Sequence, residues 1–377
     1  PVLATYGMDL QGATPALIGL AIGAYGLTQA MLQIPFGIIS DRIGRLPVIY
    51  FGLLIFAAGA AFAATADTIW GVIAGRVLQG AGAISAAVMA LLSDLTREQH
   101  RTKAMAMIGM SIGVSFAVAM VVGPLLTSAF GLSGLFWVTA GMAALGMLVV
   151  AVLPRAPAHI RHRESGVARQ ALGATLRHSD LLRLDFSIFA LHAVLMASFV
   201  ALPLALVNEA ALPKEEHWWV YLTALVVGFF GMVPFIIYGE KKRQMRRIVL
   251  GAVAVLVLSE LFLWWFGDRL WSLVGGMIVF FIAFNLLISK VAPAGGKGTA
   301  MGIYSTSQFL GSGLGGVLGG WLYQLGGLGT VFAGCAALCA LWFVVTWSMR
   351  EPPYVTGLRL PLSAGAARNP ALTEQMM

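Results

Sequence analysis

Arg76 is a basic residue within a long apolar stretch of the chain. Gln79 and Gly80 follow it at spacings of three and four residues, which place all three on one face of a helix. A charge inside a membrane is costly to bury, so it usually faces the interior of a helix bundle and marks a pathway for substrates or ions. We therefore predict that this face serves proton coupling or lines a cavity. The alternative is a structural arginine bonded only to backbone carbonyls.

Charged residues also cluster in a short segment that reads Gly37-x-x-x-Asp41-Arg42-x-Gly44-Arg45. Asp41 is expected at the C-terminal end of a helix, where the helix dipole disfavours a carboxylate. It therefore needs a nearby cation, which Arg45 can supply, or the positive end of another helix, such as one beginning near Gly298. These contacts predict a charge lock that joins the two halves of the protein while its cavity faces outward. The alternative is a solvated turn that only marks the cytoplasmic side.

Further polar side chains fall inside apolar stretches, where they could line a cavity or carry protons: Tyr25, Gln29, Gln33, His192 and Asn285. His192 could titrate near neutral pH, or it could be a satisfied core histidine. Glu260 is the costliest of the intramembrane groups to bury, and it could carry protons. Trp264 and Trp265 beside it favour instead a structural role or a position near the membrane interface.

The cysteines, Cys335 and Cys339, share one helix face in an apolar run. That setting indicates small packing residues and no metal site.

The elements that must position these residues are membrane-spanning helices. Only 11% of the 377 residues are charged and 59% are hydrophobic, whereas soluble domains carry about 25% charged residues. A spanning helix needs about 20 mainly apolar residues. About eleven segments qualify: 16–39, 47–65, 69–92, 104–128, 133–153, 184–207, 218–238, 248–266, 270–288, 299–324 and 328–348. The chain is therefore expected to be an all-α, multi-pass membrane protein.

Most of the 24 Lys and Arg residues fall in alternate loops between these segments. Basic loops stay in the cytoplasm, so these loops and the C-terminus are predicted to be cytoplasmic. Residues 1–15 then lie outside, and a chain that begins in the cytoplasm needs one more helix before them. We therefore expect the sequence to be truncated at its N-terminus, in a protein of a bacterial inner membrane.

The two halves of the chain repeat each other. Pro35 and Asp41 match Pro234 and Glu240 at an offset of 199 residues, and other pairs match at an offset of 196. Parallel repeats of six helices are typical of transporters, with the substrate site between the halves. The predicted division is an N-terminal bundle, a cytoplasmic linker, a C-terminal bundle and a cytoplasmic tail, at 1–153, 154–183, 184–349 and 350–377.

The loop at 37–45 resembles the signature loop of the major facilitator superfamily, G-x-x-x-D-R-x-G-R-R/K, with Leu46 at the last basic position. The Arg76 stretch resembles the second motif of that family, R-x-x-Q-G, which is associated with proton coupling. The resemblance also implies that Asp94 pairs with the motif arginine; an ordinary loop acid is the alternative.

A glycine-rich helix resembles the motif of the drug/proton antiporter branch, through Gly109, Gly113, Gly123 and Pro124. Close helix packing explains the same small residues without antiport. The stretches LSDLTREQHRTKAMA, KGTAMGIYSTSQFLG and MREPPYV are similar to the YajR-like members of the family.

The resemblance implies the major facilitator fold, two six-helix bundles whose first helix is here largely missing. It implies a secondary active transporter that works by alternating access, with proton-coupled efflux of a small amphipathic or drug-like molecule. We expect the protein to be a monomer in the lipid bilayer and to bind no cofactor, metal or nucleic acid. The proton gradient is expected to drive transport. A non-transporting sensor or scaffold is the alternative. A membrane-embedded enzyme is disfavoured, because it would need converging nucleophiles, acids or metal ligands.

Overall fold

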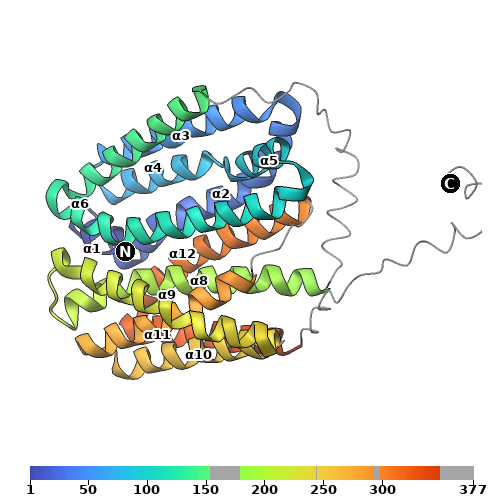
Figure 1. Cartoon of the computed structure of the whole chain (residues 1–377). Helices are drawn as coiled ribbons and strands as arrows, with labels where there is room; N and C mark the ends of the chain where they lie inside the picture. The colour runs from blue at the N-terminus through green and yellow to red at the C-terminus, as the bar shows by residue number, and fades with distance from the viewer. Residues whose placement is uncertain (153–178, 243, 292–297, 349–377) are drawn as a thin grey trace, which may run out of the picture.

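The computed structural model describes residues 1–152, 179–242, 244–291 and 298–348, and these residues form two helical bundles (Figure 1). The first bundle contains α1 (Val2–Tyr6), α2 (Pro15–Ile43), α3 (Arg45–Ala64), α4 (Ile69–Ala81), α5 (Ser85–Leu95) and α6 (Arg101–Val152). The second contains α8 (Ser179–Asn208), α9 (His217–Lys242), α10 (Met245–Phe266), α11 (Leu270–Val291) and α12 (Gly298–Trp347). Short 3₁₀ turns lie at Gly7–Asp9, Glu98–His100 and Lys214–Glu216.

Two helices cross the apolar layer twice. α6 has 52 residues and α12 has 50. A straight helix of that size would be about 75 Å long, well over twice the 30 Å hydrocarbon core. Each turns back at glycines with left-handed backbone angles, Gly131 in α6 and Gly327 in α12. The described residues contain nine long apolar helices; with these two counted twice, the eleven predicted spans are confirmed.

The predicted boundaries differ from the structure in two places. α8 begins at Ser179, inside the predicted linker, so the part of that linker at 154–178 lies outside the described residues, as does the tail at 350–377. The predicted span at 69–92 is broken between α4 and α5, because the backbone leaves the helical conformation around Gly82.

The α2–α3, α5–α6 and α9–α10 turns lie at one end of the bundles, which we call the basic end because it carries Arg42, Arg45, Arg97 and Lys241. The other end, here the opposite end, carries the α3–α4, α8–α9 and α10–α11 turns and the bends of α6 and α12. In Figure 1 the basic end is on the right.

The halves meet most closely where α2 packs against α12, through Gly19, Gly23 and Gly26 on one helix and Gly313, Gly316 and Gly320 on the other. A Cβ atom added to Gly19 would lie 2.5 Å from the carbonyl oxygen of Gly316 and 2.6 Å from the Cα atom of Gly320. The two backbones therefore touch, which glycine alone permits. This contact spans the region from the opposite end to the middle of the bundles.

Toward the basic end the halves separate. Residues 110–115 of α6 are exposed on every face of the helix, and the Met110 side chain is 70% exposed. An added Cβ atom on Gly109 or Gly113 would meet no atom within 4 Å. The predicted packing role of these two glycines is therefore wrong for this arrangement, because α6 has no neighbouring helix at that level.

The other two residues of the predicted packing motif lie deeper along α6. Gly123 is near Val2, at 3.3 Å from an added Cβ atom. Pro124 lies in the interior of α6.

Candidate functional site

Arg76 projects from α4 onto α2 and is the centre of a polar cluster in the first half. Its Nη1 donates to Oε1 of Gln79 at 2.8 Å, and its Nε donates to the carbonyl oxygen of Ala21 at 3.3 Å. The guanidinium carbon lies 4.7 Å from the centre of the Tyr25 ring, a cation–π contact. The structure thus brings the predicted Arg76, Gln79 and Tyr25 together. The hydrogen bond to the Ala21 carbonyl is what a purely structural arginine would make. The contacts with Gln79 and Tyr25 are those expected of a functional polar site.

Three buried glutamines on α2 and α4 have unused hydrogen-bonding capacity, and two of them, Gln29 and Gln79, belong to the Arg76 cluster. Gln29 donates from Nε2 to the Tyr25 hydroxyl at 3.3 Å, but its Oε1 has no partner. Nε2 of Gln79 and both amide atoms of Gln33 also lack partners, although these side chains are only 1% exposed. A buried polar group without a partner costs about 1–3 kcal/mol. The cluster is therefore suited to receive a polar group of a ligand.

Gly80 and the helix break shape this cluster without bonding in it. A Cβ atom on Gly80 would lie 2.5 Å from the carbonyl oxygen of Tyr25, so Gly80 lets α4 approach α2. Just beyond it, α4 ends and α5 begins at Ser85 without a side-chain cap. Interrupted helices beside a polar site are common in transporters. This break was not predicted from the sequence, although the closely spaced Gly80 and Gly82 could have indicated it.

At the basic end, Arg45 connects two acidic residues of the first half. Its Nε donates to Oδ2 of Asp94 at 3.2 Å, it forms an ion pair with Asp41, and its Nη1 donates to the Ser40 hydroxyl at 2.6 Å. The predicted contact of Asp94 with the motif arginine is present. Gly44, with a φ of 103°, ends α2 and lets the chain turn into α3.

The Asp41 side chain is 54% exposed. Gly37 and Arg42 complete the loop: Gly37 is partly buried, with Ala86 at 3.5 Å from an added Cβ atom, and Arg42 is exposed. Locking of the two halves by this loop stays a prediction.

Replacing Asp41 by asparagine is expected to favour the arrangement that is open at the basic end. A carboxylate next to the N-terminal end of a helix stabilises that contact by up to about 1 kcal/mol. Losing this energy changes the ratio of the two transporter states about fivefold. The measurement is the reactivity of a Met110→Cys variant with a membrane-impermeant thiol reagent, which should rise. Asp268→Asn, an exposed residue at the opposite end, is the control. An unchanged reactivity in Asp41→Asn would contradict the charge lock and would favour the alternative, in which this loop is only a solvated turn.

In the second half, His192 is buried on α8 and both of its ring nitrogens have partners. Nδ1 donates to the carbonyl oxygen of Ile188 at 3.0 Å, and Nε2 accepts from the side-chain amide of Gln308 on α12 at 2.9 Å. This pattern fits the satisfied histidine. Asn285 is partly exposed on α11, and the geometry joins neither residue to Arg76.

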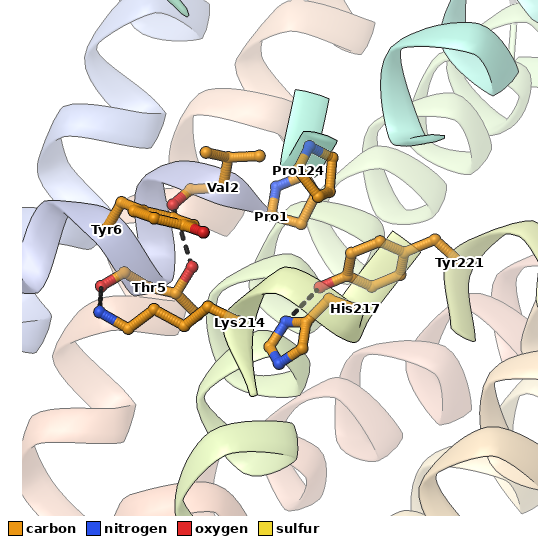
Figure 2. Close-up of a pocket in the computed structure, with 8 residues that line it drawn as sticks. All are labelled: Pro1, Val2, Thr5, Tyr6, Pro124, Lys214, His217 and Tyr221. Atoms are coloured by element: carbon orange, nitrogen blue, oxygen red, sulfur yellow. Dashed lines mark hydrogen bonds between the residues drawn. The ribbon is translucent and has the colours of Figure 1, made fainter. Parts of the chain in front are cut away.

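At the opposite end, Lys214 of the second half contacts Thr5, Tyr6 and Asp9 of the first. We call these four residues the latch, and Figure 2 shows Lys214, Thr5 and Tyr6. Lys214 donates from Nζ to Oδ2 of Asp9 at 3.0 Å and to the carbonyl oxygen of Thr5 at 3.3 Å, and it lies 5.2 Å from the centre of the Tyr6 ring. The cavity beside it, lined also by His217 and Tyr221, measures only about 10 Å³, about the space of one water. The cavity beside Lys214 is therefore too small for any organic substrate.

Replacing Lys214 by methionine is expected to weaken this closure. The change removes one ion pair, one hydrogen bond and one cation–π contact, but Lys214 and Asp9 are partly exposed, so the loss is about 1 kcal/mol. A cysteine in place of Ala16, whose backbone N–H donates to Gln324 of the other half at 3.1 Å, should become several times more reactive. Arg269→Met removes a cation that is 81% exposed at the same end and should have no effect. Equal reactivity in both variants would show that Lys214 does not hold this end closed.

Two helix bundles, with about eleven apolar crossings and a polar cluster between helices near their contact, define a membrane transport protein. The sequence model of the Major Facilitator Superfamily matches residues 1–316 and 276–370. The chain belongs to the major facilitator superfamily, and it is a transporter and not an enzyme.

Relatives refine this assignment. The chain is 53% identical to the "Inner membrane transport protein YajR" of Escherichia coli (strain K12), over 100% of this chain and 85% of that protein. It is 25% identical to the "Multidrug resistance protein MdtH" of Edwardsiella ictaluri, over 86% of this chain and 82% of that protein.

Solved structures share the fold. The human organic anion transporter MFSD10 matches with a TM-score of 0.63 and 23% identity, over 88% of this chain and 84% of that one. The nucleoside transporter NupG matches with a TM-score of 0.66 and 15% identity, over 92% of this chain and 94% of that one.

Proposed function

We propose that this chain is a proton-coupled exporter of a small amphipathic, drug-like molecule in a bacterial inner membrane. It works as a monomer, without a cofactor, and uses the proton gradient. The basic end faces the cytoplasm, as the distribution of Lys and Arg favours. Efflux is supported by the distant relatives that carry the name multidrug resistance protein.

The observation that carries this proposal is the unequal contact between the halves. At the opposite end they are joined by the latch and by the glycine contact of α2 with α12. Toward the basic end α6 stands free and Asp41 is half exposed. In alternating access, one end closes while the other opens. This arrangement is the one expected for a state that receives its cargo from the cytoplasm.

Aromatic side chains support an amphipathic substrate. Phe116 of the first half stacks on Phe199 of the second with ring centres 6.1 Å apart, and Phe199 contacts Phe281 at 6.3 Å. Such rings bind flat apolar groups, while the partly unpartnered amides near Arg76 can receive a polar group. We infer that the cargo moves between these two surfaces.

The test uses the chain in proteoliposomes that enclose a pH-sensitive dye, with ethidium as a fluorescent amphipathic probe. An imposed proton gradient should drive ethidium transport, and adding ethidium should collapse the gradient. A collapse of the proton gradient before ethidium addition would indicate only a leak. Ethidium transport at the same rate with and without the proton gradient would contradict proton coupling. If neither ethidium nor any other amphipathic dye tested is transported, a non-transporting sensor would be favoured.

A further inference from the structure

Glu260 lies inside the second bundle and has no exposed surface. The Ser198 hydroxyl of α8 donates to its Oε1 at 3.3 Å, and its Oε2 has no hydrogen-bond partner. From the sequence, Glu260 was expected to be either a structural or interfacial residue or a proton carrier. α10 turns Glu260 inward, away from the lipid-facing side, whereas Trp264 and Trp265 are exposed.

Within the described part of the chain, no cation faces this carboxyl group. α12 presents the buried Cys335 and Cys339 thiols, which are close enough to interact with it electrostatically, and α8 presents Ser198. On α11, the carbonyl oxygen of Gly276 already accepts a hydrogen bond from the Ser259 hydroxyl. Among the described residues of α9, no charged group interacts with Glu260. A carboxylate buried without a cation is costly by several kcal/mol, whereas a carboxylic acid with a hydrogen bond is not.

Further buried polar groups extend from this site toward the basic end. On α12, Trp342 and Thr346 follow Cys335 and Cys339 at helical spacing, so all four share the face that looks toward α10. The Trp342 Nε1 and the Thr346 hydroxyl are buried and have no partner. At the basic end of α10, Nε of Arg246 is also buried without a partner, while its Nη2 donates to the carbonyl oxygen of Trp347.

We propose that Glu260 is a proton-binding site of the second half, loaded from the basic end between α10 and α12. The proton adds to Oε2 and leaves from it, so that the site alternates between a carboxylic acid and a carboxylate that keeps the Ser198 hydrogen bond. Trp342 and Thr346 mark the route along which the proton arrives. This site is distinct from Arg76, which lies in the first half. Its role in transport rests on the function proposed above, but proton binding can be measured without transport.

The first experiment labels the full chain in lipid with dicyclohexylcarbodiimide, an apolar reagent that attacks protonated carboxyl groups. Mass spectrometry should find the adduct at Glu260 and not at Glu209, which is exposed and therefore serves as the matched carboxyl control. The infrared band of a protonated carboxyl group should be present in the parent chain and absent from Glu260→Gln. Trp342→Phe, which removes the indole N–H from the route and leaves a smaller apolar ring, should slow the labelling several-fold. An unlabelled Glu260 together with an unchanged infrared band in Glu260→Gln would overturn the proposal.

The second experiment places the site in transport. In the proteoliposomes described above, Glu260→Gln should still move ethidium down its gradient but should carry fewer protons per ethidium. If the parent chain moves no protons while Glu260 is labelled, the proposed function fails and the proton site stands. If the parent chain is proton-coupled and Glu260→Gln keeps the same proton-to-ethidium ratio, the role of Glu260 in transport fails by itself.

Discussion

Replacing Gly19 by alanine is expected to abolish exchange between the two states of this transporter. The new Cβ atom would lie 2.5–2.8 Å from backbone atoms of Gly316 and Gly320, and backbone cannot rotate away as a side chain can. Overpacking of this kind costs about 1–3 kcal/mol, so the opposite end should no longer close. The reactivity of Met110→Cys at the basic end should fall, because the protein is held in the other state.

A thermal measurement accompanies this prediction. The two native cysteines, Cys335 and Cys339, are buried, so a thiol-reactive dye reports their exposure on unfolding. Gly19→Ala should lower the midpoint by about 2–6 °C. Gly109→Ala is the matched control, since its Cβ atom meets nothing within 4 Å and alanine favours a helix by up to about 1 kcal/mol. If both variants behave alike, the glycine contact does not limit closure.

Gly19→Ala and Asp41→Asn should act in opposite directions. The first blocks the opposite end from closing, and the second weakens the lock proposed for the basic end. Combined in one chain, they should return the reactivity of Met110→Cys toward the parent value if the two ends are coupled through a rigid motion of the halves. Independent effects at the two ends would instead indicate local opening.

The contrast between Gly19 and Gly109 also shows how far the sequence could predict this fold. Hydrophobic length alone sets the crossings, because about 20 apolar residues must span the layer, and all eleven were predictable. Which glycine touches another helix depends on pairings across about 300 residues and on the state of the transporter. The motif with Gly109 and Gly113 was therefore assigned to packing that this state lacks, while Gly19 was overlooked.

Local rules predicted the first-half site better than the second. Arg76, Gln79 and Gly80 lie on one helix, so their common face follows from helical spacing, and the cluster exists. The Arg45–Asp94 contact came from family resemblance. For Glu260 the sequence left several roles open, because a helix can expose tryptophans such as Trp264 and Trp265 on one face and bury an acid on another. Only the packing of α8, α10 and α12 decides which face is which.

Removing the Arg76 side chain is expected to uncouple transport from the proton gradient. Arg76→Ala deletes the hydrogen bonds to Gln79 and Ala21 and the contact with the Tyr25 ring. Each hydrogen bond to a charged group contributes about 1.5–3 kcal/mol, so coupled exchange should fall at least about tenfold. The readout is gradient-driven ethidium transport compared with transport down its own gradient, which should be less affected.

Arg76→Lys separates charge from geometry. Lysine keeps the positive charge but lacks the planar fork that reaches Gln79 and Ala21 together. If the charge alone serves coupling, Arg76→Lys should retain it and Arg76→Ala should not. If the fork orders α4 against α2, both variants should lose coupling, and the thiol-dye midpoint should fall in both. Normal coupling in Arg76→Ala would assign Arg76 to structure alone and would leave Glu260 as the proton site to be tested in its place.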